Sequence, residues 1–216
     1  MRWKQSQDEL LQRRITVVMR ENVQKEVLSV ARALALGGLS SFEITFESPS
    51  ALEAVAQLKS QGNDYLVGAG TVLDLASAQA AKMASVDFIF CPHLDVELLR
   101  FGQKNDILVI PGIYTPSELM AARRAGATAV KLFPASSGGP SHLKALRGPF
   151  PKLCCIPTGG INAENLPSYI RAGAAGLGLG GSLVSVEAIF RRDWSALTLE
   201  AEKVVSAAKG EGWFSS

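Results

Sequence analysis

Short apolar segments alternate with longer amphipathic segments along the whole chain, and this alternation constrains the fold more than any other feature. The apolar segments carry few polar residues on either face, as expected for strands of a parallel sheet that is covered on both sides. The expected strands are residues 15–20, 41–46, 65–67, 88–91, 107–110, 129–133, 153–157 and 176–179. The segments with apolar residues at helical spacing include residues 23–36, 51–60, 75–85, 95–104, 117–126 and 163–173. The pattern therefore predicts repeated strand–helix units.

Glycines at positions 37–38, 62, 126 and 173 close the expected helices. The strand–helix unit recurs eight times with no linker or low-complexity segment between repeats. This favours an α/β fold in which the strands close into a (β/α)8 TIM barrel over an open sheet. We therefore predict one domain over residues 1–216, with a capping helix in 1–14, the barrel in 15–184 and a C-terminal helix in 185–209.

Composition and charge exclude several classes of protein. Of the 216 residues, 47% are apolar and 19% are charged, so the chain can bury a large core. The formal net charge is only +2 and like charges do not cluster, so neither nucleic acid nor an anionic membrane is an expected partner. The N-terminal segment has no apolar signal-peptide core, and no apolar run is long enough to span a membrane. We expect a cytoplasmic globular protein.

The cysteines and histidines do not indicate a disulfide framework or a metal site. Cys91, Cys154 and Cys155 are too few for a framework and lack metal-ligand spacing, and the last two are expected to fill core and helix-facing positions. His93 and His142 have no paired ligand at metal spacing, so surface or packing roles are favoured.

Two charged residues interrupt the expected strands, which in barrel enzymes carry the chemistry at their C-terminal ends. Lys131 lies in the apolar segment AVKLF, where burial would disfavour the charged amine and favour the neutral form that a Schiff-base lysine needs. Glu43 lies in SFEITF and can act as a general acid or base if it points inward; Thr45 shares its face of the strand. The alternatives are a lysine that reaches outward or pairs with a carboxylate, and a glutamate in a structural ion pair or facing a helix.

The ends of several expected strands carry residues that suit ligand binding. Residues 68–71 (GAGT) combine a hydroxyl with glycines that allow close backbone approach, and Arg20 is a candidate anion ligand at the end of the first strand. An ordinary glycine turn and a surface arginine are the alternatives. Residues 157–161 (PTGGI) and 178–182 (GLGGS) end the seventh and eighth strands, where barrels commonly bind phosphate through backbone N–H groups.

Over residues 15–184 the chain resembles the bacterial 2-keto-3-deoxy-6-phosphogluconate aldolases, also described as 2-keto-4-hydroxyglutarate aldolases. The resemblance is carried by GGLSSFEITFESPSALEAV, VGAGTVLD, FIFCPHLD, VIPGIYTPSE, AVKLFPAS, LKALRGPFP, PTGGINAEN and GLGGSLV. KLFPA, PTGGI and the GAGTVL turn are the most specific of these. The resemblance implies a class I aldolase of carbohydrate metabolism (the Entner–Doudoroff route) that reversibly cleaves the phosphorylated acid to pyruvate and glyceraldehyde 3-phosphate.

The same resemblance implies roles for individual residues. Lys131 would form the Schiff base, and Glu43 would be the general acid/base. The substrate would be bound by Thr71 at its pyruvyl part, by Pro92 and Phe133 as the pocket wall, by Thr158 at a hydroxyl, and by Gly159, Gly160, Gly181 and Ser182 at the phosphate. Members of this family are usually homotrimers that act on small molecules and need no cofactor or metal.

One position departs from the pattern of the family. Many members carry an arginine four residues after the glutamate, where it binds the substrate carboxylate, and here that position is Glu47. A second acid there would repel the carboxylate. We hypothesise that Arg20 supplies the missing cation, as in members that resemble galactonate-type aldolases, and that Glu47 points away from the pocket.

Other functions remain open at this stage. The same chemistry could act on 2-keto-3-deoxy-6-phosphogalactonate, on 4-hydroxy-2-oxoglutarate or on an unphosphorylated keto-deoxy acid. A phosphate-sugar isomerase or synthase would share the phosphate loops but would not need the strand lysine. A non-catalytic phosphate-binding barrel is a third alternative, and the presence of both Lys131 and Glu43 argues against it.

Overall fold

A computed structural model of the chain describes residues 1–62 and 65–214; residues 63–64 and 215–216, which the predicted domain includes, lie outside the described residues. The strands are β1 (Ile15–Met19), β2 (Ser41–Thr45), β3 (Leu66–Gly70), β4 (Phe88–Phe90), β5 (Leu108–Ile110), β6 (Gly112–Ile113), β7 (Val130–Leu132), β8 (Cys155–Pro157) and β9 (Leu177–Leu179). Every predicted strand is confirmed in place. The third is longer than predicted, because Gly68 and Gly70 continue the strand and do not form a turn.

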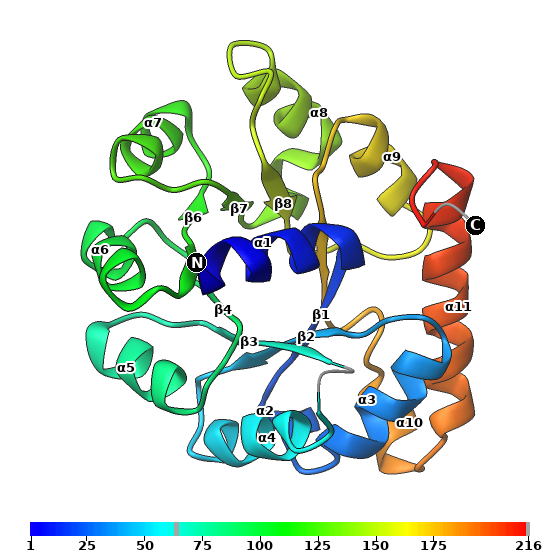
Figure 1. Cartoon of the computed structure of the whole chain (residues 1–216). Helices are drawn as coiled ribbons and strands as arrows, with labels where there is room; N and C mark the ends of the chain where they lie inside the picture. The colour runs from blue at the N-terminus through cyan, green and yellow to red at the C-terminus, as the bar shows by residue number, and fades with distance from the viewer. Residues whose placement is uncertain (63–64, 215–216) are drawn as a thin grey trace.

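The strands are parallel and form a curled sheet with helices around it (Figure 1). Six strands lie in the order β5-β4-β3-β2-β1-β9, and three in the order β6-β7-β8. β5 and β6 are consecutive, separated only by Pro111, which has no N–H to donate but still accepts a 2.9 Å hydrogen bond from the N–H of Lys131. At the other side, Thr158 forms an isolated parallel bridge with Gly178 of β9. The two groups of strands therefore meet at both of their borders.

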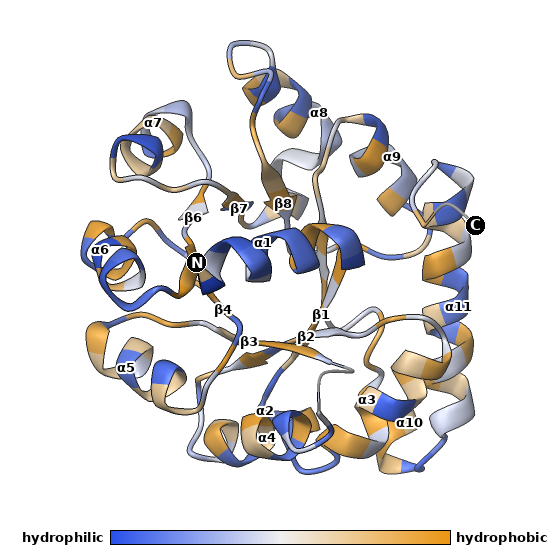
Figure 2. Ribbon diagram, viewed as in Figure 1, coloured by the Kyte–Doolittle hydropathy of each residue, from blue (hydrophilic) through white to orange (hydrophobic). Residues whose placement is uncertain are grey.

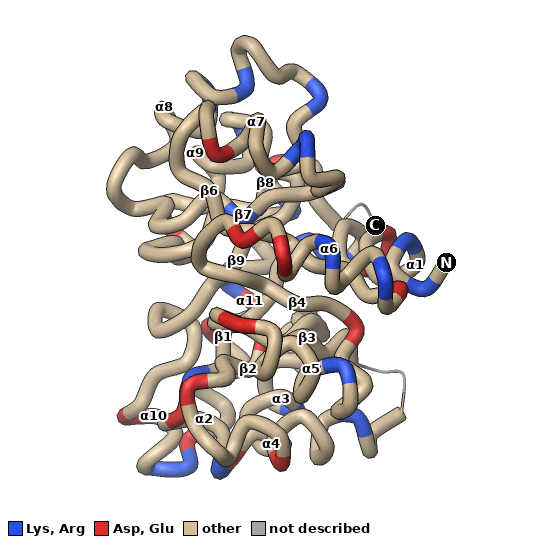
Figure 3. The backbone as a smooth tube through the Cα atoms, turned by 90° about the vertical axis from the view of Figure 1, so that its left-hand side faces the viewer, with Lys and Arg blue, Asp and Glu red and all other residues tan. Residues whose placement is uncertain are grey.

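The helices lie outside the strands, except for α1, which lies across one end of them (Figure 1). Their bounds are α1 (Arg2–Arg13), α2 (Glu21–Gln24), α3 (Val27–Leu36), α4 (Ser50–Lys59), α5 (Leu75–Met83), α6 (Val96–Asn105), α7 (Pro116–Arg124), α8 (Ala135–Arg147), α9 (Leu166–Arg171), α10 (Val186–Phe190) and α11 (Trp194–Gly210). In Figure 2 the central strands are largely hydrophobic, whereas the helices carry both kinds of residue. Figure 3 shows charges of both signs along the helices and loops. No helix within the described residues is long and apolar enough to cross a membrane.

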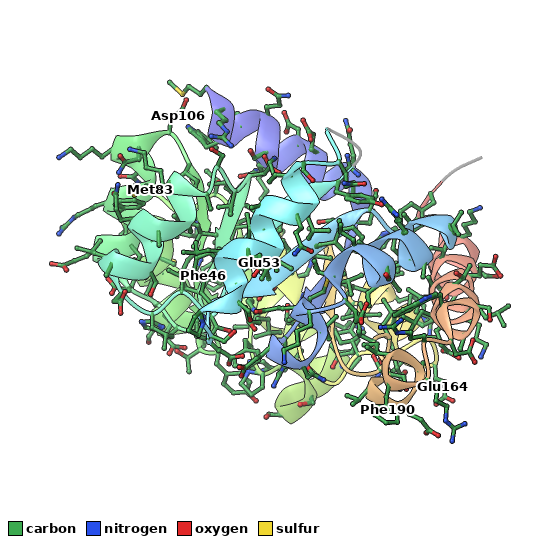
Figure 4. The ribbon with its side chains drawn as sticks, turned by 90° about the horizontal axis from the view of Figure 1, so that it is seen from below. Phe46, Glu53, Met83, Asp106, Glu164 and Phe190 are labelled. Atoms are coloured by element: carbon green, nitrogen blue, oxygen red, sulfur yellow. The ribbon has the colours of Figure 1, made fainter. Side chains whose placement is uncertain are left out.

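Three helical predictions are corrected. The helix expected over residues 23–36 is divided into α2 and α3, and the C-terminal helix expected over 185–209 is divided into α10 and α11. The second break occurs at Arg192, which has a positive φ of 53°, after which Asp193 caps α11. Helix α8 was not predicted, because Gly139 and Pro140 interrupt its sequence pattern. In the structure Gly139 has a φ of 64° and kinks the helix. Phe190 of α10 is 89% exposed at the edge of the molecule (Figure 4).

The core has two layers that follow the alternation of strand side chains. An outer layer lies between strands and helices, and an inner cluster lies within the curled sheet. In β4, Phe88 and Phe90 belong to the inner cluster, whereas Ile89 belongs to the outer layer. Leu10 of α1 joins the inner cluster, so this helix covers one end of the strands as predicted. The C-terminal ends of the strands lie at the end of the sheet opposite α1, and the candidate site is located there.

Candidate active site

Lys131 of β7 and Glu43 of β2 both point inward, because the residues on either side of each belong to the outer core layer. The side-chain nitrogen of Lys131 lies 3.4 Å from Oε1 of Glu43. The side chains are only 6% and 1% exposed. The sequence alternatives in which Lys131 reaches solvent or Glu43 faces a helix are therefore wrong, and the pair forms a buried contact.

The pKa of Glu43 is raised above its ordinary value. The main cause is burial, which penalises the carboxylate; the charge and hydrogen bond of Lys131 oppose this shift. Arg20 lowers the pKa of Glu43 and Glu47 raises it, both through their charges. Oε2 of Glu43 has no hydrogen-bond partner among the residues that the structure describes. This carboxyl can therefore hold or release a proton and has an oxygen free for a ligand.

Glycine and aromatic residues shape the space around the pair. A Cβ atom on Gly70 would lie 1.9 Å from Oε1 of Glu43, so only glycine at this position leaves room for the carboxyl. The nitrogen of Lys131 lies 5.2 Å from the ring centre of Phe90 and 5.4 Å from that of Phe133. Burial raises the pKa of the neighbouring Cys91 thiol to about 12, so this group stays protonated at neutral pH. The lysine amine is thus enclosed by two rings and one acid.

A cavity of about 390 Å³ opens over the pair at the C-terminal ends of the strands. Its lining brings together all the predicted site residues: Arg20, Glu43, Thr71, Pro92, Lys131, Phe133, Thr158, Gly159, Gly160, Gly181 and Ser182. It also includes Val18, Thr45, Ile161 and Gly180, which the site prediction did not name. Inward apolar residues such as Val18 look like core in the sequence, so only the fold identifies them as lining.

Two glycine turns form one wall of the cavity. Gly159 and Gly160 have positive φ angles of 104° and 72°, which favour glycine at both positions. The hydroxyl of Ser182 donates a 2.6 Å hydrogen bond to the carbonyl of Ile161 and so joins this turn to the one after β9. The backbone N–H groups of Gly159, Gly160, Gly181 and Ser182 donate to no acceptor within the described part of the chain. They are available to an anion in the cavity.

Arg20 and Glu47 both line the cavity. The expectation that Glu47 points away from the pocket is therefore wrong. Both residues follow strands and are exposed, so their charges lie at the rim of the cavity. Each charge shifts the pKa of Glu43. A cation and an anion thus stand at the same part of the rim.

The histidines lie outside the cavity. The ring of His142 stacks on Tyr114 at 4.5 Å and one of its nitrogens lies 2.7 Å from the Tyr114 carbonyl oxygen, which confirms a packing role. Cys155 is buried in the outer core layer and Cys154 packs against the inner cluster. Among residues 1–62 and 65–214, no group of three or more histidine, cysteine, aspartate or glutamate residues is placed to hold a metal ion.

Comparisons of the sequence and of the fold relate the chain to known proteins. Residues 7–199 match the family described as KDPG and KHG aldolase. A 2-dehydro-3-deoxy-phosphogluconate aldolase of Pseudomonas aeruginosa is 39% identical over 184 residues, which cover 84% of this chain and 83% of that protein. A protein of the same name from Pseudoalteromonas atlantica is 34% identical over 210 residues, covering 96% and 98%. A crystal structure of KDPG aldolase from Legionella pneumophila, with pyruvate captured as a covalent carbinolamine intermediate, is 36% identical with a TM-score of 0.83, covering 88% and 93%.

Proposed function

Since the chain belongs to the KDPG and KHG aldolase family of carbon–carbon lyases, we propose that it cleaves 2-keto-3-deoxy-6-phosphogluconate reversibly to pyruvate and glyceraldehyde 3-phosphate through a Schiff base on Lys131. The observation that carries the proposal is the buried contact between Lys131 and Glu43 at the base of the cavity. Its glycine turns have backbone N–H groups with no acceptor among the described residues. An isomerase or a purely phosphate-binding protein has no need of this pair.

In the proposed reaction, the neutral amine of Lys131 adds to the C2 ketone, and water leaves to give a protonated imine. Glu43 then removes the proton of the C4 hydroxyl while the C3–C4 bond breaks. The electron pair of that bond moves to C3 and the imine nitrogen, giving an enamine, and glyceraldehyde 3-phosphate leaves. Glu43, or a water molecule beside it, returns a proton to C3, and hydrolysis frees pyruvate and the lysine.

The cavity lining supports a specific arrangement of substrate. Pro92 and Phe133 are proposed to flank the pyruvyl part, and Thr71 to bind it. Thr158 is proposed to face the C4 hydroxyl. The turns at Gly159–Gly160 and Gly181–Ser182 are proposed to hold the phosphate through their free N–H groups, so that remote binding energy positions the reacting carbons.

The substrate carboxylate needs a cation, and Arg20 is the residue proposed for it. Its place in the cavity lining supports this role. Family members that resemble galactonate-type aldolases also carry the arginine at the end of the first strand, so the C4 epimer, 2-keto-3-deoxy-6-phosphogalactonate, is the second candidate substrate. The epimers differ only at the carbon that lies beside Glu43 and Thr158. A coupled assay of pyruvate release, with 4-hydroxy-2-oxoglutarate and an unphosphorylated keto-deoxy acid as further substrates, separates these candidates.

We also propose that β1–β5 and β6–β9 form a single closed eight-stranded barrel in which β5 and β6 count as one strand interrupted at Pro111. Two contacts support closure: the hydrogen bond from the N–H of Lys131 to the carbonyl of Pro111, and the bridge between Thr158 and Gly178. The proposal extends to one domain over the whole chain, to a homotrimer and to a cytoplasmic location. Sedimentation of the purified protein tests the trimer.

Borohydride reduction in the presence of pyruvate, followed by peptide mass mapping, tests the mechanism. We expect one covalent adduct, on the peptide that contains Lys131, and none in Lys131→Ala. Lys59→Ala is the matched control: Lys59 also contacts a carboxylate, Asp87 at 3.0 Å, but lies outside the cavity, so its variant should keep the adduct. An adduct on another lysine, or none in the unmodified protein, would overturn the proposal.

A further inference from the structure

Two buried side-chain atoms have no hydrogen-bond partner among the residues that the structure describes: Oε2 of Glu43 and Oγ1 of Thr45. The first belongs to the proposed general acid/base. The second has no role in the proposed reaction, although Thr45 is only 3% exposed. Buried hydroxyl groups almost always have a partner, because an unpaired one loses its hydration without compensation.

The strand register places Thr45 between two residues proposed to bind the pyruvyl end of the substrate. Thr45 lies two residues after Glu43 on β2, so its side chain shares the inward face, and it lines the cavity. On one side it pairs with Gly70, the residue before Thr71. On the other side, the register of β1 and β2 ends with Met19 opposite Ile44, so Arg20 is the next residue beside Thr45.

The chemistry of this position points to an acceptor that arrives from the cavity. A threonine hydroxyl donates one proton, and a carboxylate can only accept. The carboxylate of a 2-keto acid is bonded to C2, the carbon that Lys131 attacks, so it must lie within one bond of the reacting carbon. Thr45 stands between a cation and a second hydroxyl on the wall beside that carbon.

We propose that the hydroxyl of Thr45 donates a hydrogen bond to the carboxylate of the bound 2-keto acid, and so is a third ligand of this group with Arg20 and Thr71. The inference rests on the proposed function. It explains why a threonine, and not a valine of nearly the same shape, occupies a buried position without an internal partner. The hydroxyl has no partner among the described residues, and the bound substrate supplies one.

The test compares two small ketones in the borohydride trapping reaction. Pyruvate carries the carboxylate, and 2-butanone has an ethyl group in its place. In Thr45→Val we expect the pyruvate concentration for half-maximal trapping to rise by about tenfold to a hundredfold, the range for a hydrogen bond to a charged group. Trapping of 2-butanone should stay unchanged, and Thr45→Ser should restore pyruvate binding. Thr45→Ala removes the hydroxyl with less bulk and should behave like Thr45→Val.

Thr16 of β1 supplies the matched control. It is also a buried strand threonine, but its hydroxyl lies 3.0 Å from that of Ser41. Thr16→Val should melt at a lower temperature than the unmodified protein and keep its preference for pyruvate over 2-butanone. Thr45→Val should melt at an equal or higher temperature, because it removes an unpaired hydroxyl.

Two results overturn the inference while the proposed function stands. One is unchanged pyruvate trapping in Thr45→Val, which would leave the hydroxyl to water; the other is an equal loss for both ketones, which would indicate a general effect on Lys131. If the unmodified protein forms no adduct with pyruvate, the proposed function fails and the inference fails with it.

Discussion

The side-chain nitrogen of Lys131 lies 3.4 Å from Oε1 of Glu43, while Oε2 of the same carboxyl has no partner within the described residues. One oxygen of the acid therefore faces the amine, and the other remains available to a ligand. In the proposed reaction these two oxygens have separate uses: one stays near the imine nitrogen, and the other takes the proton from the substrate hydroxyl.

The first prediction concerns the separation of imine formation from bond cleavage. Glu43→Gln keeps the shape of the side chain but cannot remove the C4 proton, so kcat for pyruvate release should fall by about 10²–10⁴. The Lys131 adduct with pyruvate should still form on long incubation with borohydride, because the amine remains. Retained kcat in this variant would show that another group acts as the base.

The second prediction concerns stability and pH. Burial raises the pKa of Glu43 in the folded protein above its value in the unfolded chain, so the folded protein keeps a proton that the unfolded chain releases. The window begins near 4.5, the ordinary value, and extends up to the raised pKa. Stability from this group is fully present below the window and is lost as the pH rises through it. Glu43→Gln has no such proton to lose.

Urea unfolding at a series of pH values measures this effect. The free energy of unfolding of Glu43→Gln, minus that of the unmodified protein, should increase as the pH rises above 4.5, by about 1.4 kcal/mol for each unit by which folding raises the pKa. A difference that is constant across the window would mean that folding leaves the pKa of Glu43 unchanged.

Much of this site follows from the period of two along a strand. The neighbours of Lys131 and of Glu43 are apolar, and in a barrel those neighbours face the helices, so the charged residues must face the interior. The glycine turns after two strands also follow from the sequence, because the positive φ angles of Gly159 and Gly160 favour glycine. The distance between Lys131 and Glu43 could not be predicted from the sequence, because it depends on how strands far apart in the sequence are arranged around the interior.

The features that sequence reasoning missed lie where periodicity is absent. Glu47 lies in a turn after β2, so no strand alternation gives its direction, and the wrong prediction for it came from charge repulsion alone. Helix α8 contains Gly139 and Pro140, which lower helix propensity, and it is kinked at Gly139, whose φ of 64° is not helical. Its two parts are stabilised by the packing of residues such as Ala135 and Leu143 against the core. The break at Pro111 leaves two short strands where one was predicted.

The third prediction tests the space that Gly70 leaves for Glu43. In Gly70→Ala the added Cβ would lie 1.9 Å from Oε1 of Glu43, so the carboxyl must move. We expect a loss of about 1–3 kcal/mol in the free energy of unfolding from overpacking, together with a fall in kcat. Gly68→Ala, on the same face of β3, is the control, because its Cβ would meet the ring of Phe88 at 2.1 Å and not the acid. It should lose stability and keep most of its kcat; equal losses of kcat would refute a specific effect on Glu43.

The fourth prediction concerns the opposite charges at the rim. Arg20→Ala should raise the KM for the phosphorylated keto acid by about tenfold, through loss of a charge-assisted contact that is partly screened at an exposed position. Glu47→Gln should lower KM severalfold, because it removes a like charge from the cavity lining. Both effects should shrink as salt is added. Arg32→Ala removes an arginine that bonds to Gln61 on the outer surface and should leave KM unchanged.

The same two variants should move the pH dependence of kcat/KM in opposite directions. The charge of Arg20 lowers the pKa of Glu43 and that of Glu47 raises it, so the acidic limb of the profile should shift upward in Arg20→Ala and downward in Glu47→Gln. A steady-state pH series for both variants measures these shifts. If Arg20→Ala changes neither KM nor the limb, the cation that binds the carboxylate must be sought elsewhere; if it changes KM alone, Arg20 binds the substrate without tuning the acid.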